Sequence, residues 1–379
     1  MGSIAKGVIH QGQVVATYRK AKDWSQSDLA EVLKIDLRTV QRMERQAFIK
    51  NLDRREFLAG ILEIPVALMG LENDQKLAEK VQRVLNHDRM AFFEQEMEAR
   101  RSLYHTGGTI CAACGLDAWI RELAEFIELA QGTGWQRRGL VLLTMSYQLQ
   151  ICVSRDLLDF AQAQEAGHKA YQIAQELNDP ELLAATMAHQ GIALLQEEKA
   201  IEAISYLNGG LEVVRYTGFP GIRSYILQAL SEAYAKTQQS RECWQSIHLA
   251  ERALEQYRQT QDYSKTQLFA SSIIAQKGVN AVLLHDYERA EALIDKALMQ
   301  YNPTFIRGRA RLLAQKAEAC SGLEMAEESA TIAEEALRLA RSVGSRKTTE
   351  RIQSLHSRFQ ESRWRKERSV VRLGALLAR

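Results

Sequence analysis

The chain has 379 residues, and its 49 Lys and Arg against 47 Asp and Glu give a formal net charge of +2. This length exceeds one ordinary hydrophobic core, so we expect several domains or a repeat array. No apolar run reaches the ~18 residues that cross a bilayer, and the chain does not begin with the apolar core of a signal peptide. Five scattered cysteines are typical of a reducing cytosol, so we expect a cytoplasmic protein with no membrane contact.

The charge is distributed unevenly along the chain. Residues 1–55 contain eleven Lys and Arg against six Asp and Glu, and residues 338–379 contain twelve against three. The middle of the chain is therefore acidic. A basic N-terminal part fits neutralisation of DNA phosphates, whereas an acidic middle argues against a long surface that follows nucleic acid.

Residues 25–45 predict two short helices joined by a tight turn. Ser25 followed by Asp28 is a capping-box pattern that marks the start of the first helix. The apolar residues that would line one side of this helix are Leu29, Ala30 and Leu33.

The second helix follows a turn at Lys34 and Ile35. Asp36 can cap it, and the spacing of Val40 and Met43 directs both of them inward. Its remaining faces are polar and largely basic. Side chains of these types form hydrogen bonds to base edges in a DNA major groove.

This stretch resembles the lambda-repressor-like (Xre-type) helix-turn-helix family. In that family a Gln opens the second helix of the domain, an Ala follows a Leu, and a Val or Ile anchors the recognition helix before a Glu. The matching residues here are Gln26, Leu29 with Ala30, Val40, and Glu44. The chain departs from the pattern at Lys34 and Gln46, where the family usually has Gly.

The resemblance implies a surface that binds double-stranded DNA. We expect Arg38, Gln41 and Arg42 to read bases, and Gln26, Arg45 and Lys50 to hold phosphates. The full set of expected DNA-binding residues is Gln26, Arg38, Thr39, Gln41, Arg42, Arg45 and Lys50.

The segment after this motif contains a possible export signal. The Arg pair that begins at Arg54 precedes an apolar run, as in twin-arginine signals, but Glu63 interrupts that run. We instead expect Asp53 to cap a helix that ends near Glu63, and Pro65 to open a one-turn helix. A five-helix DNA-binding domain over residues 1–71 follows from this interpretation.

Residues 72–134 are expected to form connecting helices and a loop. The irregular stretch HTGGTICAACG contains Cys111 and Cys114, with His105 nearby, which could be half of a zinc site or a redox pair. A structural zinc ion needs four ligands, and no second Cys-x-x-Cys completes the set, so we favour a plain loop with no metal. The chain also lacks a Walker A, a GxGxxG and a GxSxG motif, so we expect no cofactor and no enzymatic activity.

Residues 135–362 repeat a pattern of small and apolar residues. A small residue is followed by an Ala-like residue twelve positions later, an apolar residue four further on, and a small residue three beyond that. The four clear copies are Gly191, Ala203, Leu207 and Gly210; Ser231, Cys243, Ile247 and Ala250; Gly278, Ala290, Ile294 and Ala297; and Ala317, Ser329, Ala333 and Ala336. A weaker copy begins at Ile151, so the copies advance by 40, 40, 47 and 39 residues.

Small residues at such positions allow paired helices to touch, and the pattern resembles tetratricopeptide repeats with long helices. The expected fold is therefore all-α, with a five-helix repressor-like domain followed by a tetratricopeptide-like α-solenoid. The concave side of such a solenoid is lined by the first helix of each pair. The expected effector groove consists of Tyr147, His189, Arg223, Tyr225, Gln228, Gln276, Asn280 and Arg307.

The tail at residues 363–379 combines apolar and basic residues. It could cap the last repeat or contact a second subunit, or it could be a basic arm that touches DNA. We favour the cap or subunit contact, because Val370, Val371, Leu376 and Leu377 would be poorly placed in water and DNA contact would not need them.

The combination of these parts resembles the bacterial peptide-pheromone receptors of the Rap/Rgg/PlcR superfamily. The resemblance implies a homodimeric transcription regulator, active in quorum sensing, whose repeats bind a peptide or protein effector. The alternative is an interaction scaffold or defence-system adaptor whose DNA-binding domain only tethers it to DNA.

Overall fold

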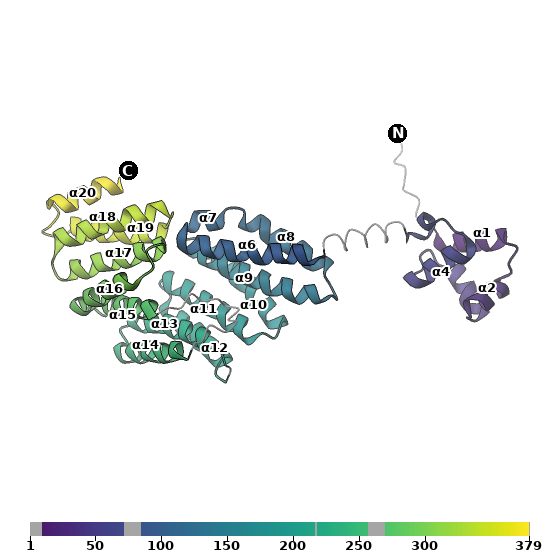
Figure 1. Ribbon diagram of the computed structural model, residues 1–379, viewed down its shortest axis with the longest axis horizontal. Coiled ribbons are helices and arrows are strands. Elements are labelled where there is room, and N and C mark those ends of the chain that lie inside the picture. The colour runs from purple at the N-terminus through teal and green to yellow at the C-terminus, as the bar shows by residue number, and fades with distance from the viewer. Residues whose placement is uncertain (1–9, 72–84, 217, 257–269, 379) are drawn as a thin grey trace. The chain divides into compact units, whose positions relative to one another are not determined.

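The computed structural model describes residues 10–71, 85–216, 218–256 and 270–378, and every regular element in these ranges is a helix (Figure 1). The all-α prediction is confirmed for these residues. The chain divides into two compact units, Met1–Asn86 and His87–Arg379. We call their described parts the head (residues 10–71) and the array (residues 85–378, with the gaps given above).

The head contains four α-helices and one 3-10 helix. They are α1 (Gln11–Ala21), α2 (Gln26–Leu33), α3 (Leu37–Glu44), α4 (Leu52–Leu62) and η1 (Val66–Met69). Their apolar faces meet in one core that includes Val15, Leu29, Val40, Leu58 and Met69. These helices are short, so their stability comes mostly from this shared core.

The turn between α2 and α3 has the predicted local structure. The capping box of α2 is complete, since Ser25 Oγ accepts the Asp28 N–H at 3.1 Å and Asp28 Oδ2 accepts the Ser25 N–H at 2.6 Å. Lys34 ends α2 in the left-handed region with φ 51°. Asp36 then caps α3 by accepting the Thr39 N–H at 2.8 Å.

Two expected helix starts are wrong by one or two residues. Asn51 rather than Asp53 caps α4, because its extended backbone lets Oδ1 accept the Arg54 N–H at 2.7 Å. Asp53 lies in the first helical turn, where a carboxylate also favours the helix dipole. Pro65 is the residue before η1 and not its first residue.

The array begins with three helices and continues as consecutive helix pairs. The first three are α6 (His87–Thr106), α7 (Thr109–Ala113) and α8 (Leu116–Leu129). The pairs are α9 (Gly134–Asp156) with α10 (Phe160–Glu176), α11 (Pro180–Gln196) with α12 (Ala200–Val213), α13 (Pro220–Lys236) with α14 (Ser240–Glu255), α15 (Ala270–Leu283) with α16 (Tyr287–Gln300), and α17 (Ile306–Gly322) with α18 (Ala326–Ser342). Two helices, α19 (Arg346–Gln360) and α20 (Arg368–Leu377), end it.

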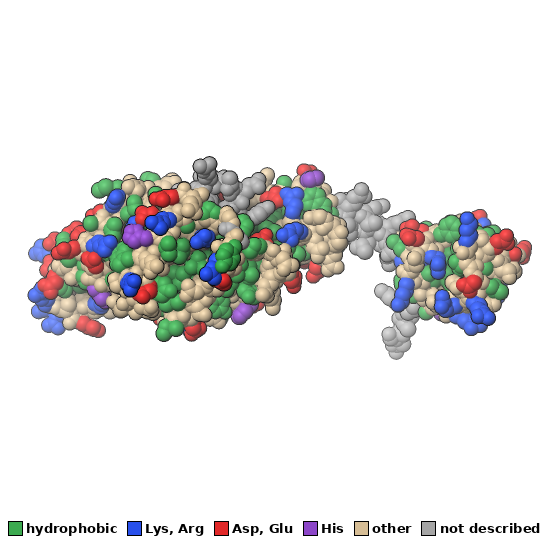
Figure 2. All heavy atoms as spheres, turned by 90° about the horizontal axis from the view of Figure 1, so that it is seen from below, with side chains coloured by type: hydrophobic (Ala, Val, Ile, Leu, Met, Phe, Trp, Pro, Cys, Tyr) green, Lys and Arg blue, Asp and Glu red, His purple; other side chains and the backbone are tan. Residues whose placement is uncertain are grey.

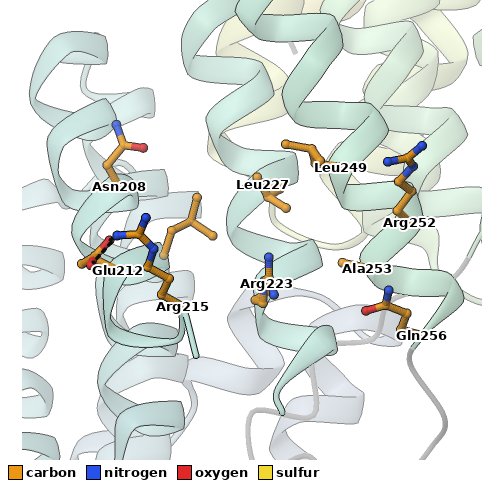
Figure 3. Close-up of a pocket in the computed structure, with 10 residues that line it drawn as sticks. Asn208, Glu212, Arg215, Arg223, Leu227, Leu249, Arg252, Ala253 and Gln256 are labelled. Carbon is orange, nitrogen blue, oxygen red and sulfur yellow. Dashed lines mark hydrogen bonds and ion pairs between the residues drawn. The ribbon is translucent and has the colours of Figure 1, made fainter. Parts of the chain in front are cut away.

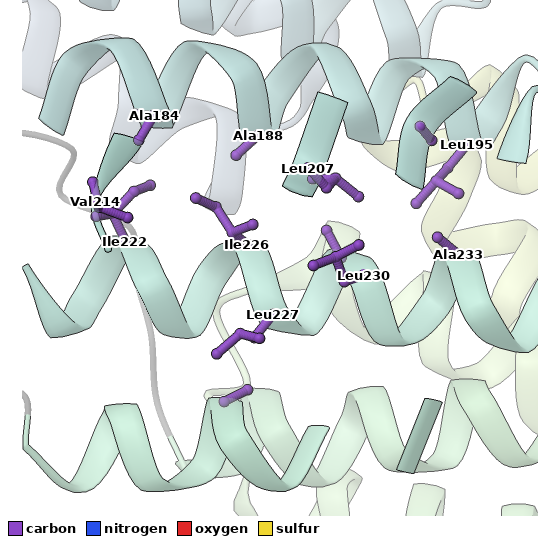
Figure 4. Packing of buried hydrophobic residues seen from close by; sticks show 14 of the residues in the cluster. Ala184, Ala188, Leu195, Leu207, Val214, Ile222, Ile226, Leu227, Leu230 and Ala233 are labelled. Carbon is purple, nitrogen blue, oxygen red and sulfur yellow. The ribbon is translucent and has the colours of Figure 1, made fainter. Parts of the chain in front are cut away.

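The repeated small residues are places of close helix contact. A Cβ added at Gly191 would lie 2.7 Å from Leu207 Cγ, and one added at Gly278 would lie 2.6 Å from Ile294 Cγ1. In both copies, the small residue of the first helix receives the apolar residue of the second. Figure 4 shows this packing around Leu207, beside residues of the neighbouring helix α13.

Each helix pair also turns at a residue with positive φ. Leu158, Glu198, Gln238, His285 and Glu324 have φ between 58° and 64°. They follow one another by 40, 40, 47 and 39 residues, which are the intervals of the small-residue pattern. None of the five is Gly, so each turn costs of order 1 kcal/mol that the packing of the pair must offset.

The beginning and end of the array contact each other (Figure 1). The Thr109 N–H donates to the Val343 carbonyl at 3.0 Å. The buried Asp156 carboxylate accepts hydrogen bonds from Thr109 Oγ1 and, at 3.0 Å, from Ser345 Oγ. The stretch HTGGTICAACG, expected to be a plain loop, therefore supplies the helix α7 and the contact that closes the array.

Helix α20 covers the last helices of the array. Val370 and Leu373 are fully buried and pack in one cluster with Leu355 and Phe359. Arg372 forms an ion pair with Glu334 of α18. The apolar residues of the tail thus cap the array, while Val371 stays 56% exposed.

Candidate functional site

The head exposes basic side chains on and after α3. Arg38 and Arg42 of α3 are exposed, as are Arg45 and Lys50, while Gln41 is half-buried. Figure 2 shows one face of the head on which Lys and Arg side chains gather towards one edge. Beside α3 lies a hollow of about 410 Å³ whose lining includes Arg42, Lys50 and Arg54.

A buried ion pair holds α3 against α1 and α2. Arg19 of α1 donates to Glu44 through Nε at 2.6 Å and Nη2 at 3.3 Å, and through Nη1 to the Trp24 carbonyl at 2.6 Å. Gln26 Nε2 also donates to Glu44 Oε2 at 2.8 Å. Both charged side chains are more than nine-tenths buried. Sequence reasoning matched Glu44 to the family pattern but missed this role.

Two residues that were predicted to contact DNA form hydrogen bonds within the head. The amide nitrogen of Gln26 is bound to Glu44, and the Thr39 hydroxyl donates to Asp36 Oδ2 at 2.6 Å. Both side chains therefore help to build the turn. The other expected residues, Arg38, Arg42, Arg45 and Lys50 with the half-buried Gln41, remain on the surface.

A second group of polar residues lies on α6 and on the first helices of four pairs in the array. We call it the inner cluster, and it consists of Tyr104, Cys152, Arg155, His189, Tyr225 and Arg307. Tyr104 donates its hydroxyl to the Cys152 carbonyl at 3.1 Å, and Cys152 Sγ lies 3.4 Å from His189 Nδ1. The rings of His189 and Tyr225 are 5.5 Å apart, and Arg307 Cζ lies 4.0 Å from the Tyr104 ring centre.

The inner cluster contains three of the eight expected groove residues, His189, Tyr225 and Arg307. Sequence reasoning missed Tyr104, Cys152 and Arg155. The weak repeat copy that begins at Ile151 was the only sequence signal near Cys152 and Arg155, and it carried no information on which side chains point inward.

The charges of the cluster act strongly on its titratable groups. Burial raises the pKa of the Cys152 thiol, but His189 and Arg155 more than offset this and lower it to about 6. Burial lowers the pKa of the neighbouring His105 to about 3, with help from the charges of Arg307 and Arg101. His105 is therefore neutral near pH 7, and thiolate is favoured at Cys152.

Three other expected groove residues form structural hydrogen bonds. Asn280 donates to Ser231 Oγ at 2.9 Å, and Gln276 donates to Asn280 Oδ1 at 3.0 Å, which links α13 with α15. Gln228 donates to Ser224 Oγ at 3.5 Å within α13. Asn280 thus links two helices, whereas the Gln276–Asn280 bond stays within α15 and the Gln228 bond within α13.

The last two expected groove residues lie apart from the inner cluster. Lys169 stacks on the Tyr147 ring at 5.7 Å. Arg223 lines a hollow of about 520 Å³ together with Arg215, Arg252 and apolar residues of α13 and α14 (Figure 3). The expectation of one continuous groove is therefore not met, because neighbouring residues on one helix point to different sides.

The expected Cys-x-x-Cys pair lies on the surface of the array. Cys111 and Cys114 are exposed. In the described part of the chain, the one group of three ligand side chains close enough to share an ion is Glu291, Cys320 and Glu328. Burial raises the pKa of Cys320 to about 12, so its thiol keeps its proton. No helix in the described ranges is long and apolar enough to cross a membrane.

The fold defines an all-helical repeat protein that carries a small separate helical unit. No protein-family profile and no curated protein matches the chain. Among solved structures, aspartyl phosphate phosphatase F from Bacillus subtilis is 13% identical, with 89% of this chain and 95% of that chain covered and a TM-score of 0.48.

Two further solved structures are similar. Bacillus thuringiensis PlcR, in complex with the peptide PapR7 and DNA, is 16% identical over 88% of this chain and 96% of that chain, with a TM-score of 0.35. The STAND protein PH0952 from Pyrococcus horikoshii, with a tetratricopeptide repeat sensor, is 14% identical over 97% and 63%, with a TM-score of 0.43. These values are too low to carry an activity from these proteins to this chain.

Proposed function

We propose that the chain is a sequence-specific, DNA-binding transcription regulator whose helical repeats sense a peptide or protein effector. The observation that carries the proposal is the surface of α3. This helix follows a left-handed turn, is held against α1 and α2 by Glu44, and exposes Arg38 and Arg42. A rigid helix with exposed Arg side chains is suited to bidentate contacts with guanine in a major groove.

The effector part of the proposal rests on the inner surface of the array. Polar and aromatic side chains from different helix pairs converge in the inner cluster, as expected of a site that orients a ligand. The sequence resemblance to peptide-pheromone receptors makes a peptide the favoured effector. We assign no enzymatic activity and no cofactor, since no catalytic motif is present in the sequence.

Replacing Arg42 with Ala tests the DNA-binding surface. A site selected from a random DNA pool should be bound more weakly by about 1 to 3 kcal/mol, because one base contact is lost. Competition binding at fixed salt measures this loss. Lys50→Ala, which removes an expected phosphate contact, should weaken cognate and random DNA alike. Equal weakening of both DNAs by Arg42→Ala would contradict its assignment to a base edge.

We propose further that the regulator is a homodimer, which would place two heads on a palindromic site. One head contacts too few bases and phosphates to select a site against a genome. Light scattering of the full chain at tens of micromolar should give about twice its mass of 42.9 kDa. A monomer under these conditions would refute the dimer.

A further inference from the structure

The inner cluster lies in a region where basic side chains outnumber acidic ones. The basic residues are Arg155, Arg307, Arg311, Lys347 and Arg351, and the acidic ones are Asp156, Glu232 and Glu318. The acids already accept hydrogen bonds, and Glu232 Oε2 accepts one from Gln276 at 3.2 Å. Asp156 accepts hydrogen bonds from two hydroxyl groups, and Glu318 binds Arg351 in a bidentate pair at 2.8 and 2.9 Å.

Arg155 has a buried donor with nothing to bind. Its exposed fraction is 8%, and its Nη1 has no hydrogen-bond partner. Arg307 Nε is likewise buried without a partner. Neither guanidinium has a carboxylate within ion-pair distance in the part of the chain that the structure describes. Cys152, whose thiolate is favoured, is the anion beside them, but both N–H donors stay unbonded. A buried donor without an acceptor is unfavourable, so this site has binding capacity that the described chain does not use.

The pKa of Lys347 also indicates an excess of positive charge in this region. Its pKa is well below the ordinary value for lysine, first because of burial and then because of the charge of Arg155. An anion bound nearby would oppose both effects.

Four side chains of this region come from the two ends of the array. Tyr104 and Arg155 belong to α6 and α9, whereas Arg307 and Lys347 belong to α17 and α19. These are the same ends that the hydrogen bonds of Thr109 and Ser345 join. A group bound between Arg155 and Arg307 would therefore touch both ends.

We propose that the inner cluster is an anion-binding site, in which a carboxylate or phosphate group binds between Arg155 and Arg307 and stabilises the closed array. Planar guanidinium groups bind both oxyanions through paired hydrogen bonds. The inference rests on the proposed function only in placing the effector on the inner side of the array. The effector would be recognised through its carboxylate or phosphate group, and the anion site does not depend on DNA binding.

Thermal unfolding of the full chain tests the site with inorganic phosphate and, separately, acetate as probes. At constant ionic strength set with chloride, one probe should raise the Tm in a saturable way by roughly 2–4 °C at about ten times its Kd. A response to phosphate alone identifies a phosphoryl ligand. A response to acetate of similar or larger size identifies a carboxylate, such as a peptide terminus or acidic side chain.

Arg155→Met separates specific binding from general salt effects. This variant should lose the saturable response, since it removes one of the two guanidinium groups that bind the anion. Arg307→Gln should also lose the response. Arg241→Met, which changes an exposed residue of α14, should keep it.

Three results would overturn the site. They are no saturable response to either probe in the wild type, a response that persists in either Arg155→Met or Arg307→Gln, or its loss in Arg241→Met. Failure of Arg155→Met to fold would leave Arg307→Gln as the deciding variant. Because no DNA is present, these outcomes are independent of those for Arg42→Ala.

Discussion

Glu44→Ala is expected to destabilise the head by about 3–5 kcal/mol, which is the usual cost of removing one partner of a buried ion pair. Arg19 would stay buried at 5% exposure without its carboxylate, and Gln26 would lose its acceptor. A unit of this size has few kcal/mol to spare, so it should unfold at a lower temperature than the array.

Native-state hydrogen exchange of residues 10–71 in the full chain measures this effect. Glu31→Ala, on the exposed face of α2, is the matched control and should change stability by no more than about 0.5 kcal/mol. Since α3 depends on Glu44 for its position, Glu44→Ala should also weaken binding to every DNA sequence. Equal protection in the two variants would show that the ion pair does not hold the head together.

Gly108→Ala is expected to open the contact between the two ends of the array, at a cost of roughly 2–5 kcal/mol. Gly108 has φ 97°, and an added Cβ would lie 2.4 Å from the Val343 carbonyl oxygen and 2.6 Å from its Cα. Backbone atoms cannot rotate away as a flexible side chain can. The chain must therefore separate at Thr109 and Val343.

Gly132→Ala is a matched control for Gly108→Ala. Gly132 also has positive φ, at 75°, but nothing lies within 4 Å of an added Cβ. Gly132→Ala should therefore lower the free energy of unfolding by only about 1–2 kcal/mol, which is the cost of a positive φ for a residue with a Cβ. Thermal unfolding and exchange of the Thr109 amide report the difference, and equal losses in both variants would show that the closing contact contributes nothing to stability.

Local patterns in the sequence determined much of the secondary structure. The capping box at Ser25, the turn at Lys34 and the cap at Asp36 depend on residues at most a few positions apart, so they can be recognised from neighbours alone. The spacing of small residues likewise identified the helix pairs, because Gly191 and Leu207 contact each other within one pair.

Tertiary structure alone decided which distant residues share a site. The Glu44 network joins three helices of the head, and the inner cluster joins residues from Tyr104 to Arg307. Which residues meet there depends on the small rotation that each helix pair adds to the last, summed over the whole array. A short sequence pattern does not include this accumulated rotation. The sequence therefore predicted Arg223 and Tyr225 in one groove and did not predict Arg155. In the structure, the contact between Thr109 and Val343 closes the array, and Arg155 and Arg307 lie near each other.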